Sequence, residues 1–97
     1  MITRSRLREF WLRHPDAERP LRAWYRLTRH ASWAHFAELK QDFPSADQVG
    51  RLVVFNVGGN KHRLISYVDY SHRMVFIRNV LTHPDYSRER WKDDPWF

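Results

Sequence analysis

The stretch "VVFNVGGNKHRLI", residues 53–65, decides the fold. It opens with β-branched and aromatic residues, which are typical of a strand. Gly58 and Gly59 follow, and because glycine reaches positive φ without steric cost, the pair predicts a two-residue hairpin turn. The chain then returns through "KHRLI", which places a lysine, a histidine and an arginine on one short hairpin. This concentration of positive charge needs an explanation of its own.

The rest of the chain divides into a helical half and a strand half. In the second half, 51–57, 60–70 and 74–83 are predicted strands, with another short turn at Ser71 and His72. In the first half, apolar residues recur three and four positions apart, as in amphipathic helices, and Pro15 ends the first helix. The predicted inward residues are Leu7, Phe10 and Trp11 of a first helix, Leu21, Trp24, Tyr25 and Thr28 of a second, and Trp33, Phe36 and Ala37 of a third.

Helices followed by a three-stranded meander predict an α+β fold. The helices are expected to pack on one face of a small, mainly antiparallel sheet, within a single domain that spans residues 1–97. The segment 42–50 contains proline, serine and glycine and is predicted to be an irregular break between the two halves. The last residues, about 87–97, are expected to form a short tail, to which no role is assigned.

Composition narrows the class of partner. The 97 residues carry a formal net charge of +6, which suits an anionic partner such as nucleic acid, a membrane surface or an acidic protein. Cysteine is absent, which excludes disulfides and zinc–thiolate sites and favours a reducing compartment. The charged N-terminus shows no signal peptide, and no apolar run approaches the length of a membrane span. A cytoplasmic protein without membrane association is therefore expected.

Strand parity distributes the charge, because successive side chains of a strand point to opposite faces. The predicted turns give four cross-strand pairs, which are Asn56 with Lys61, Val54 with Arg63, Arg63 with Val80, and Ile65 with Arg78. The face expected to pack on the helices holds Val53, Phe55, Val57, Leu64, Val68, Val75, Ile77 and Leu81. The other face holds Val54, Asn56, Lys61, Arg63, Ile65, Tyr67, Phe76 and Arg78.

This second face gathers cations and aromatic side chains. Lys61, Arg63 and Arg78 are interleaved with Tyr67 and Phe76, and such a surface can neutralise phosphates and stack bases. RNA binding by these five residues is the functional interpretation. The simpler interpretation is that the lysine and the arginines are ordinary solvent-facing strand residues.

A histidine and a tyrosine follow the third strand in "THPDY", residues 82–86. His83 can take or give a proton near neutral pH, and Tyr86 can donate a hydrogen bond or act as a base. A lone histidine at a strand end is more often structural. Beside the cations, however, the pair suits RNA cleavage by attack of the 2′-OH. Lys61, Arg63 and Arg78 would stabilise the phosphorane charge, and His83 or Tyr86 would move the protons.

Other chemical signatures are missing from the sequence. "GGNK", residues 58–61, lacks the spacing of a P-loop, and no HExxH or GxSxG motif occurs. The six histidines are scattered without the spacing of metal ligands. No metal and no cofactor are therefore expected.

Four segments together resemble the HigB toxin family, a branch of the RelE-like toxins of bacterial toxin–antitoxin systems. They are "LREFWLRHPDAERPLRAWYR" (7–26), "FPSADQVG" (43–50), "VFNVGGNKHRLI" (54–65) and "IRNVLTHPDY" (77–86). The resemblance extends from about residue 2 to residue 86 and leaves out the last eleven residues.

The resemblance implies a RelE-like fold with an RNA groove on the sheet face opposite the helices. It implies an mRNA interferase, an endoribonuclease that cuts messenger RNA on the translating ribosome. It also implies a cognate antitoxin with a helix-turn-helix domain, through which the toxin would contact operator DNA. Lys61, Arg63 and Arg78 would hold charge at the phosphate, and His83 and then Tyr86 would transfer protons. Two alternatives stay open, a non-catalytic RNA- or ribosome-binding module and an adaptor for acidic proteins.

Overall fold

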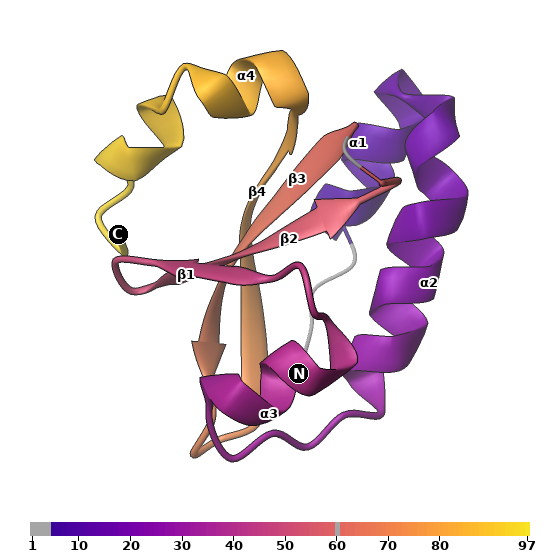
Figure 1. Ribbon diagram of the computed structural model, residues 1–97. Helices are drawn as coiled ribbons and strands as arrows, with labels where there is room; N and C mark the ends of the chain where they lie inside the picture. The colour runs from indigo at the N-terminus through magenta and orange to yellow at the C-terminus, as the bar shows by residue number, and fades with distance from the viewer. Residues whose placement is uncertain (1–4, 60) are drawn as a thin grey trace.

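The computed structural model describes residues 5–59 and 61–97 and has the predicted α+β architecture (Figure 1). Helices pack on a four-stranded antiparallel sheet in which β1, β2, β3 and β4 are neighbours in chain order. The elements are α1 (Ser5–Arg13), the 3-10 turn η1 (Pro15–Ala17), α2 (Glu18–Arg29), α3 (Phe36–Asp42), β1 (Asp47–Val49), β2 (Leu52–Val57), β3 (His62–Asp69), β4 (Met74–Thr82), α4 (His83–Ser87) and the 3-10 turn η2 (Arg90–Asp93).

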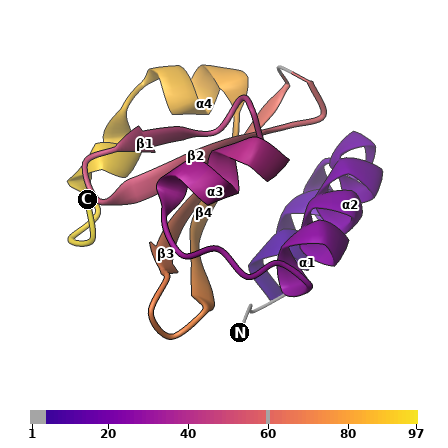
Figure 2. The same cartoon turned by 60° about the horizontal axis from the view of Figure 1, so that its bottom comes forward.

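The first two helices form and pack as predicted. They lie side by side on one side of the sheet, with α3 in the same core (Figure 2). Trp24 of α2 and Phe43 after α3 both meet Phe55 of β2 edge to face, and Phe55 is 1% exposed. Aromatic pairs of this kind tie the helices to the middle of the sheet. The predicted inward residues of α1 and α2 are buried, and only Tyr25 among them is partly exposed.

The third helix differs from the prediction. It begins at Phe36 and buries Leu39, whereas the predicted inward residue Ala37 is exposed. Trp33 is buried but precedes the helix, and its indole N–H donates to a carboxylate oxygen of Asp42 at 2.8 Å. Trp33 therefore packs into the core from the loop before α3, and its hydrogen bond joins this loop to the last residue of that helix.

A short strand forms where an irregular break was predicted. Residues 47–49 make β1 and pair with β2, so the sheet has four strands rather than three. Gly50 makes this connection with a φ of +59°, a left-handed conformation that favours glycine. The glycine was recognised as a breaker, but here it turns the chain back on the sheet.

The first hairpin turn is longer than predicted. Val57 pairs with His62, so the connection between β2 and β3 is longer than the two glycines alone. Gly58 and Gly59 have φ values of +65° and +69°, as expected of glycines in a tight turn. The predicted conformation of the glycines is confirmed and the predicted turn length is wrong; Asn60 lies outside the described residues.

The longer turn moves the cross-strand pairs by two residues. Asn56 pairs with Arg63 rather than with Lys61, and Val54 pairs with Ile65 rather than with Arg63. Because side chains alternate with a period of two, this even shift leaves every β2 and β3 side chain on its predicted face.

A β-bulge interrupts β4 at Arg78. Ser66 pairs with Ile77 and Ile65 pairs with Asn79, so Arg78 has no opposite residue and the predicted pair of Ile65 with Arg78 is wrong. The sequence gives no sign of this bulge, because apolar residues continue along β4 before and after Arg78.

Beyond the bulge the predicted faces exchange. Arg63 pairs with Leu81 instead of Val80. Val80 therefore joins the core under the helices, and Leu81 joins the opposite face, contrary to prediction. The other residues predicted for the helix-packed face, from Val53 to Ile77, are in or against that core.

The C-terminal tail, residues 87–97, covers part of the other face of the sheet. In both views α4 and the C-terminus lie across the sheet from α2 (Figures 1 and 2). We call the sheet surface under α1, α2 and α3 the helix face and the opposite surface the tail face. A second core forms on the tail face from Leu52, Val54, Ile65 and Trp91, with Val49, Tyr67, Leu81, Tyr86, Trp96 and Phe97 packed around it.

Candidate active site

The site residues predicted from the sequence separate into two groups. Lys61, Arg63, His83 and Tyr86 meet where the β2–β3 turn adjoins the start of α4, and we call them the end cluster. Tyr67, Phe76 and Arg78 lie further along the strands against Trp96 and Asp94, and we call these five residues the tail cluster.

Backbone pairing places His83 beside Lys61. The His83 amide donates to the Lys61 carbonyl at 3.0 Å, just past the end of the β3–β4 ladder. Thr82 then starts α4, because its hydroxyl accepts a hydrogen bond from the Asp85 amide. The side chains of Lys61 and His83 are both exposed. A cation and a group that can transfer a proton therefore reach solvent at the end of the sheet where the β2–β3 turn adjoins α4.

Arg63 is buried beneath the tyrosine of the end cluster. It is 8% exposed, and its Nη1 donates to the carbonyl of His62 at 3.2 Å. Its guanidinium carbon lies 5.3 Å from the centre of the Tyr86 ring, within the range of a cation–π contact. Arg63 therefore supports Tyr86 from below and is not an open contact surface.

Trp91 is a contributor to the end cluster that the sequence interpretation missed. Its indole stacks on the Tyr86 ring, with centroids 5.2 Å apart and planes 11° apart, and its Nε1 donates to the Tyr86 carbonyl at 3.1 Å. The sequence holds a signal for it, since a tryptophan in the tail of a small protein has few ways to avoid water except by packing on the domain.

The three basic side chains of the β2–β3 hairpin lie in three different environments. Lys61 is exposed in the turn, and Arg63 is buried on the tail face. His62 points to the helix face, where it is 5% exposed, meets the Phe10 ring edge-on and places Nε2 3.1 Å from a carboxylate oxygen of Asp16. This hydrogen bond lowers the pKa of Asp16. Of these three basic side chains, only that of Lys61 is exposed.

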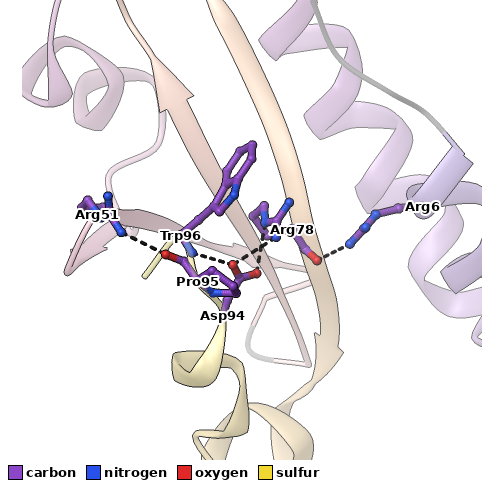
Figure 3. Close-up of polar contacts among 6 residues, drawn as sticks. All are labelled: Arg6, Arg51, Arg78, Asp94, Pro95 and Trp96. Carbon is purple, nitrogen blue, oxygen red and sulfur yellow. Dashed lines mark hydrogen bonds and ion pairs between the residues drawn. The ribbon is translucent and has the colours of Figure 1, made fainter.

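Arg78 is engaged within the chain, as Figure 3 shows. Its Nε and Nη2 donate to the two carboxylate oxygens of Asp94 at 3.0 and 3.1 Å, and its guanidinium carbon lies 4.0 Å from the centre of the Trp96 ring. The Arg78 carbonyl accepts a hydrogen bond from Arg6 of α1. A bidentate pair that also stacks on a ring is a strong, oriented contact.

The aromatic members of the tail cluster also pack on the tail. Tyr67 and Phe76 each meet Trp96 edge to face at 5.4 Å. Arg51 holds the next residues, because its Nη2 donates to the Pro95 carbonyl and its amide donates to the Phe97 carbonyl. RNA binding by Tyr67, Phe76 and Arg78 stays a prediction, while their contacts in the structure are with the tail.

The Asp94 carboxylate leads to a prediction about acid stability. Hydrogen bonds from Arg78, together with the amide of Trp96, hold the pKa of Asp94 below its usual value. A lowered folded-state pKa adds stability above the unfolded-state pKa of about 3.9, and that stability is lost as the pH falls through the folded value. Asp94→Asn is therefore expected to unfold more easily than the wild type at neutral pH, with the difference shrinking in acid.

Urea unfolding measured from neutral pH to below the usual aspartate pKa tests this prediction. Asp93→Asn is the matched control, since Asp93 is the exposed neighbour of Asp94. An unfolding difference between wild type and Asp94→Asn that stays constant through the acid range would contradict the assignment.

Within residues 5–59 and 61–97, no group of three or more His, Cys, Asp or Glu side chains is placed to hold a metal ion. No helix in the same part of the chain is long and apolar enough to cross a membrane.

Comparison with known proteins agrees with the resemblance seen in the sequence. Residues 17–89 match the HigB_toxin family, described as the RelE-like toxic component of a toxin–antitoxin system. The mRNA interferase HigB of Escherichia coli O6:H1 is 23% identical over 91 residues, covering 91% of this chain and 88% of the relative. The mRNA interferase toxin HigB of Escherichia coli K12 and the mRNA interferase HigB of Shigella flexneri are each 32% identical over 90 residues, covering 90% of this chain and 86% of each relative.

Proposed function

Because the chain belongs to the HigB toxin family, the RelE-like toxic components of toxin–antitoxin systems, we propose that it is an mRNA interferase neutralised by a cognate antitoxin. The observation that carries this proposal is the backbone hydrogen bond from His83 to Lys61, which holds two residues with exposed side chains at the same end of the sheet. An imidazole and an ammonium group at one end of the sheet can supply proton transfer and phosphate charge stabilisation to the same bound RNA.

The proposed reaction uses the nucleophile that RNA carries. His83 takes the proton of a 2′-OH, the 2′-oxygen bonds to the adjacent phosphorus, and the bond from phosphorus to the 5′-oxygen breaks. The leaving 5′-oxygen takes up a proton, delivered by Tyr86 or by water. The products are a 2′,3′-cyclic phosphate and a 5′-hydroxyl, so atoms and charge balance without a co-reactant. Lys61 stabilises the negative charge of the phosphorane.

Arg63 and Tyr86 have supporting parts in this proposal. Arg63 is buried, so it acts through its charge beneath the site and through the Tyr86 ring that it contacts. Tyr86 belongs to α4, is half-buried with its ring in contact with Arg63 and Trp91, and retains an exposed part. The tail cluster is left out of the reaction, because its cation already has a carboxylate and a ring as partners.

The remaining partners follow from the same proposal. With few acid–base groups of its own, the site would depend on the ribosome to orient the mRNA, because orientation of the reacting groups supplies much of a catalytic rate. That dependence would place the protein in the cytoplasm. The antitoxin would carry a helix-turn-helix domain, and the chain would reach operator DNA only as part of that complex.

Induced expression in bacteria with mapping of mRNA 5′ ends tests the proposed function. Growth arrest with new 5′-hydroxyl ends is the expected result, and the ends should require translating ribosomes when purified chain and mRNA are combined. Arrest without new ends would favour the non-catalytic RNA- or ribosome-binding module instead. New 5′-phosphate ends would contradict attack by the 2′-OH.

A further inference from the structure

A groove lined by arginines and aromatic rings follows the outer side of α1 and α2 toward the β3–β4 turn. It consists of three adjoining hollows of about 590, 170 and 270 Å³. The first and second hollows share Trp11 and Arg22, and the second and third share Tyr25 and Arg29. We call this surface the arginine groove. The helices α1 and α2, which line most of this groove, lie across the sheet from α4 and the tail (Figure 2).

The arginine groove is strongly cationic. Arg8, Arg22, Arg26 and Arg29 line the first two hollows, and no carboxylate of the described residues lines either of them. Arg22 bonds to Glu18, yet its guanidinium also lies 4.8 Å from the Trp11 ring, and the Arg29 guanidinium lies 5.8 Å from the Tyr25 ring. Rings that hold guanidinium groups in place reduce the entropy lost when an anion binds.

The groove also exposes apolar surface, which distinguishes between two kinds of anionic partner. Leu12 lines the first hollow beside Trp11 and is 68% exposed, the largest exposure among the large apolar side chains of the described residues. A protein segment can bury a leucine against its own apolar side chains, whereas a nucleic acid offers mainly phosphates, sugars and base edges. The mixture of leucine, rings and arginines therefore favours an acidic amphipathic peptide over RNA.

The third hollow, at the turn end of the groove, contains hydroxyls without partners. Thr28 is 4% exposed, and neither its hydroxyl nor that of Tyr70 has a hydrogen-bond partner among the described residues. Burial raises the pKa of Tyr70, so its hydroxyl remains a hydrogen-bond donor at neutral pH. Buried polar groups are normally satisfied, and two such hydroxyls in one hollow indicate a place for an acceptor from outside the chain.

We propose that the arginine groove binds an acidic amphipathic segment of the cognate antitoxin. Apolar side chains of that segment cover Leu12 and Trp11, its carboxylates face Arg26 and Arg29, and one acceptor side chain enters the third hollow toward Thr28. The inference rests on the proposed function only for the existence of an antitoxin, which the family supplies. It does not depend on whether the end cluster cuts RNA.

A charge-reversal pair tests the groove with a matched control. Arg26→Glu with Arg29→Glu alters two exposed arginines of the groove, and Arg88→Glu with Arg90→Glu alters two exposed arginines beyond α4. Affinity of each purified chain for the purified antitoxin, encoded beside it, is measured at low and high salt. We expect the groove pair to lose about tenfold or more in affinity and much of the salt dependence, with the control pair unchanged.

A second variant separates the contribution of the third hollow to antitoxin affinity from the contribution of the arginine charges. Thr28→Val keeps the side-chain shape and removes the hydroxyl, so affinity should fall without a change in salt dependence. Thermal unfolding of each variant shows that the chains are folded.

Wild-type affinity in the Arg26 and Arg29 pair would overturn the inference. The inference would also be overturned if the Arg26→Glu, Arg29→Glu protein kept its affinity for the antitoxin but lost binding to ribosomes or to polyuridylate. The groove would then be a nucleic-acid surface. Affinity needs no RNA cutting, so failure of the proposed function leaves this test intact. Where cutting is observed, the groove pair should cut mRNA at the wild-type rate.

Discussion

His83→Ala is expected to reduce mRNA cutting by about 10²–10⁴-fold while leaving the protein folded. The loss follows from removing the group that takes the 2′-OH proton, which is the step that nothing else in the end cluster performs as readily near neutral pH. Stability should be spared because the side chain is exposed and the hydrogen bond to Lys61 comes from the backbone amide, which alanine retains. The measurement is the initial rate of cutting at one mRNA site in a translating system, with thermal unfolding alongside.

His30→Ala is the control for His83→Ala. His30 is also exposed and also adjoins a helix end, but it follows directly after α2, which packs on the helix face. It should cut at the wild-type rate. Equal activity of His83→Ala and wild type would remove His83 from the reaction and leave Tyr86 as the candidate for proton transfer.

Trp91→Ala is expected to lower the free energy of unfolding by about 3–5 kcal/mol, the range for removing a large aromatic side chain from a core. Trp91 is 5% exposed and packs with Leu52, Val54 and Ile65, so the variant leaves a cavity at the centre of the second core. The same change removes the indole that stacks on Tyr86. Cutting should therefore fall together with stability, although Trp91 has no part in the proposed reaction itself.

Urea unfolding of Trp91→Ala, Trp91→Phe and Leu12→Ala measures this effect. The phenylalanine keeps a ring against Tyr86 and should recover much of both stability and cutting. Leu12→Ala removes an apolar side chain that is largely exposed, so its stability should stay close to that of the wild type. A Trp91→Ala protein as stable as the wild type would show that the tail does not pack on the sheet as described.

Local sequence patterns were sufficient to predict most of the residues that pack between the helices and the sheet. The spacing of Leu7, Phe10 and Trp11 specifies one buried stripe, and strand parity places Val53, Phe55 and Val57 together on one face of β2. In α1 one side meets the core and the other meets water, whereas β2 is buried on both faces. Parity alone therefore gives the face assignments of the β2 residues. They survive an error of two residues in the hairpin, since such a shift keeps each side chain on its face.

The sequence was sufficient to predict which residues form the candidate site, but not which of them lie together in space. Lys61, Arg63, His83 and Tyr86 were named from the sequence, and they meet at one end of the tail face. Arg78 was expected beside them on an open surface, but the bulge and the tail give it Asp94 and Trp96 as partners instead. Neither contact has a local signature, because each joins residues that are many positions apart.

By itself, the sequence determined the α+β class, the faces of the helices, the positive φ of the hairpin glycines and membership of the HigB toxin family. Each of these depends on neighbouring residues or on a motif. The tertiary structure alone decided which cations are open to solvent and which are buried, and that the tail covers part of the tail face. Exposure is a property of whatever packs against a side chain, and for Arg63 and Arg78 that neighbour comes from the last residues of the chain or from α4.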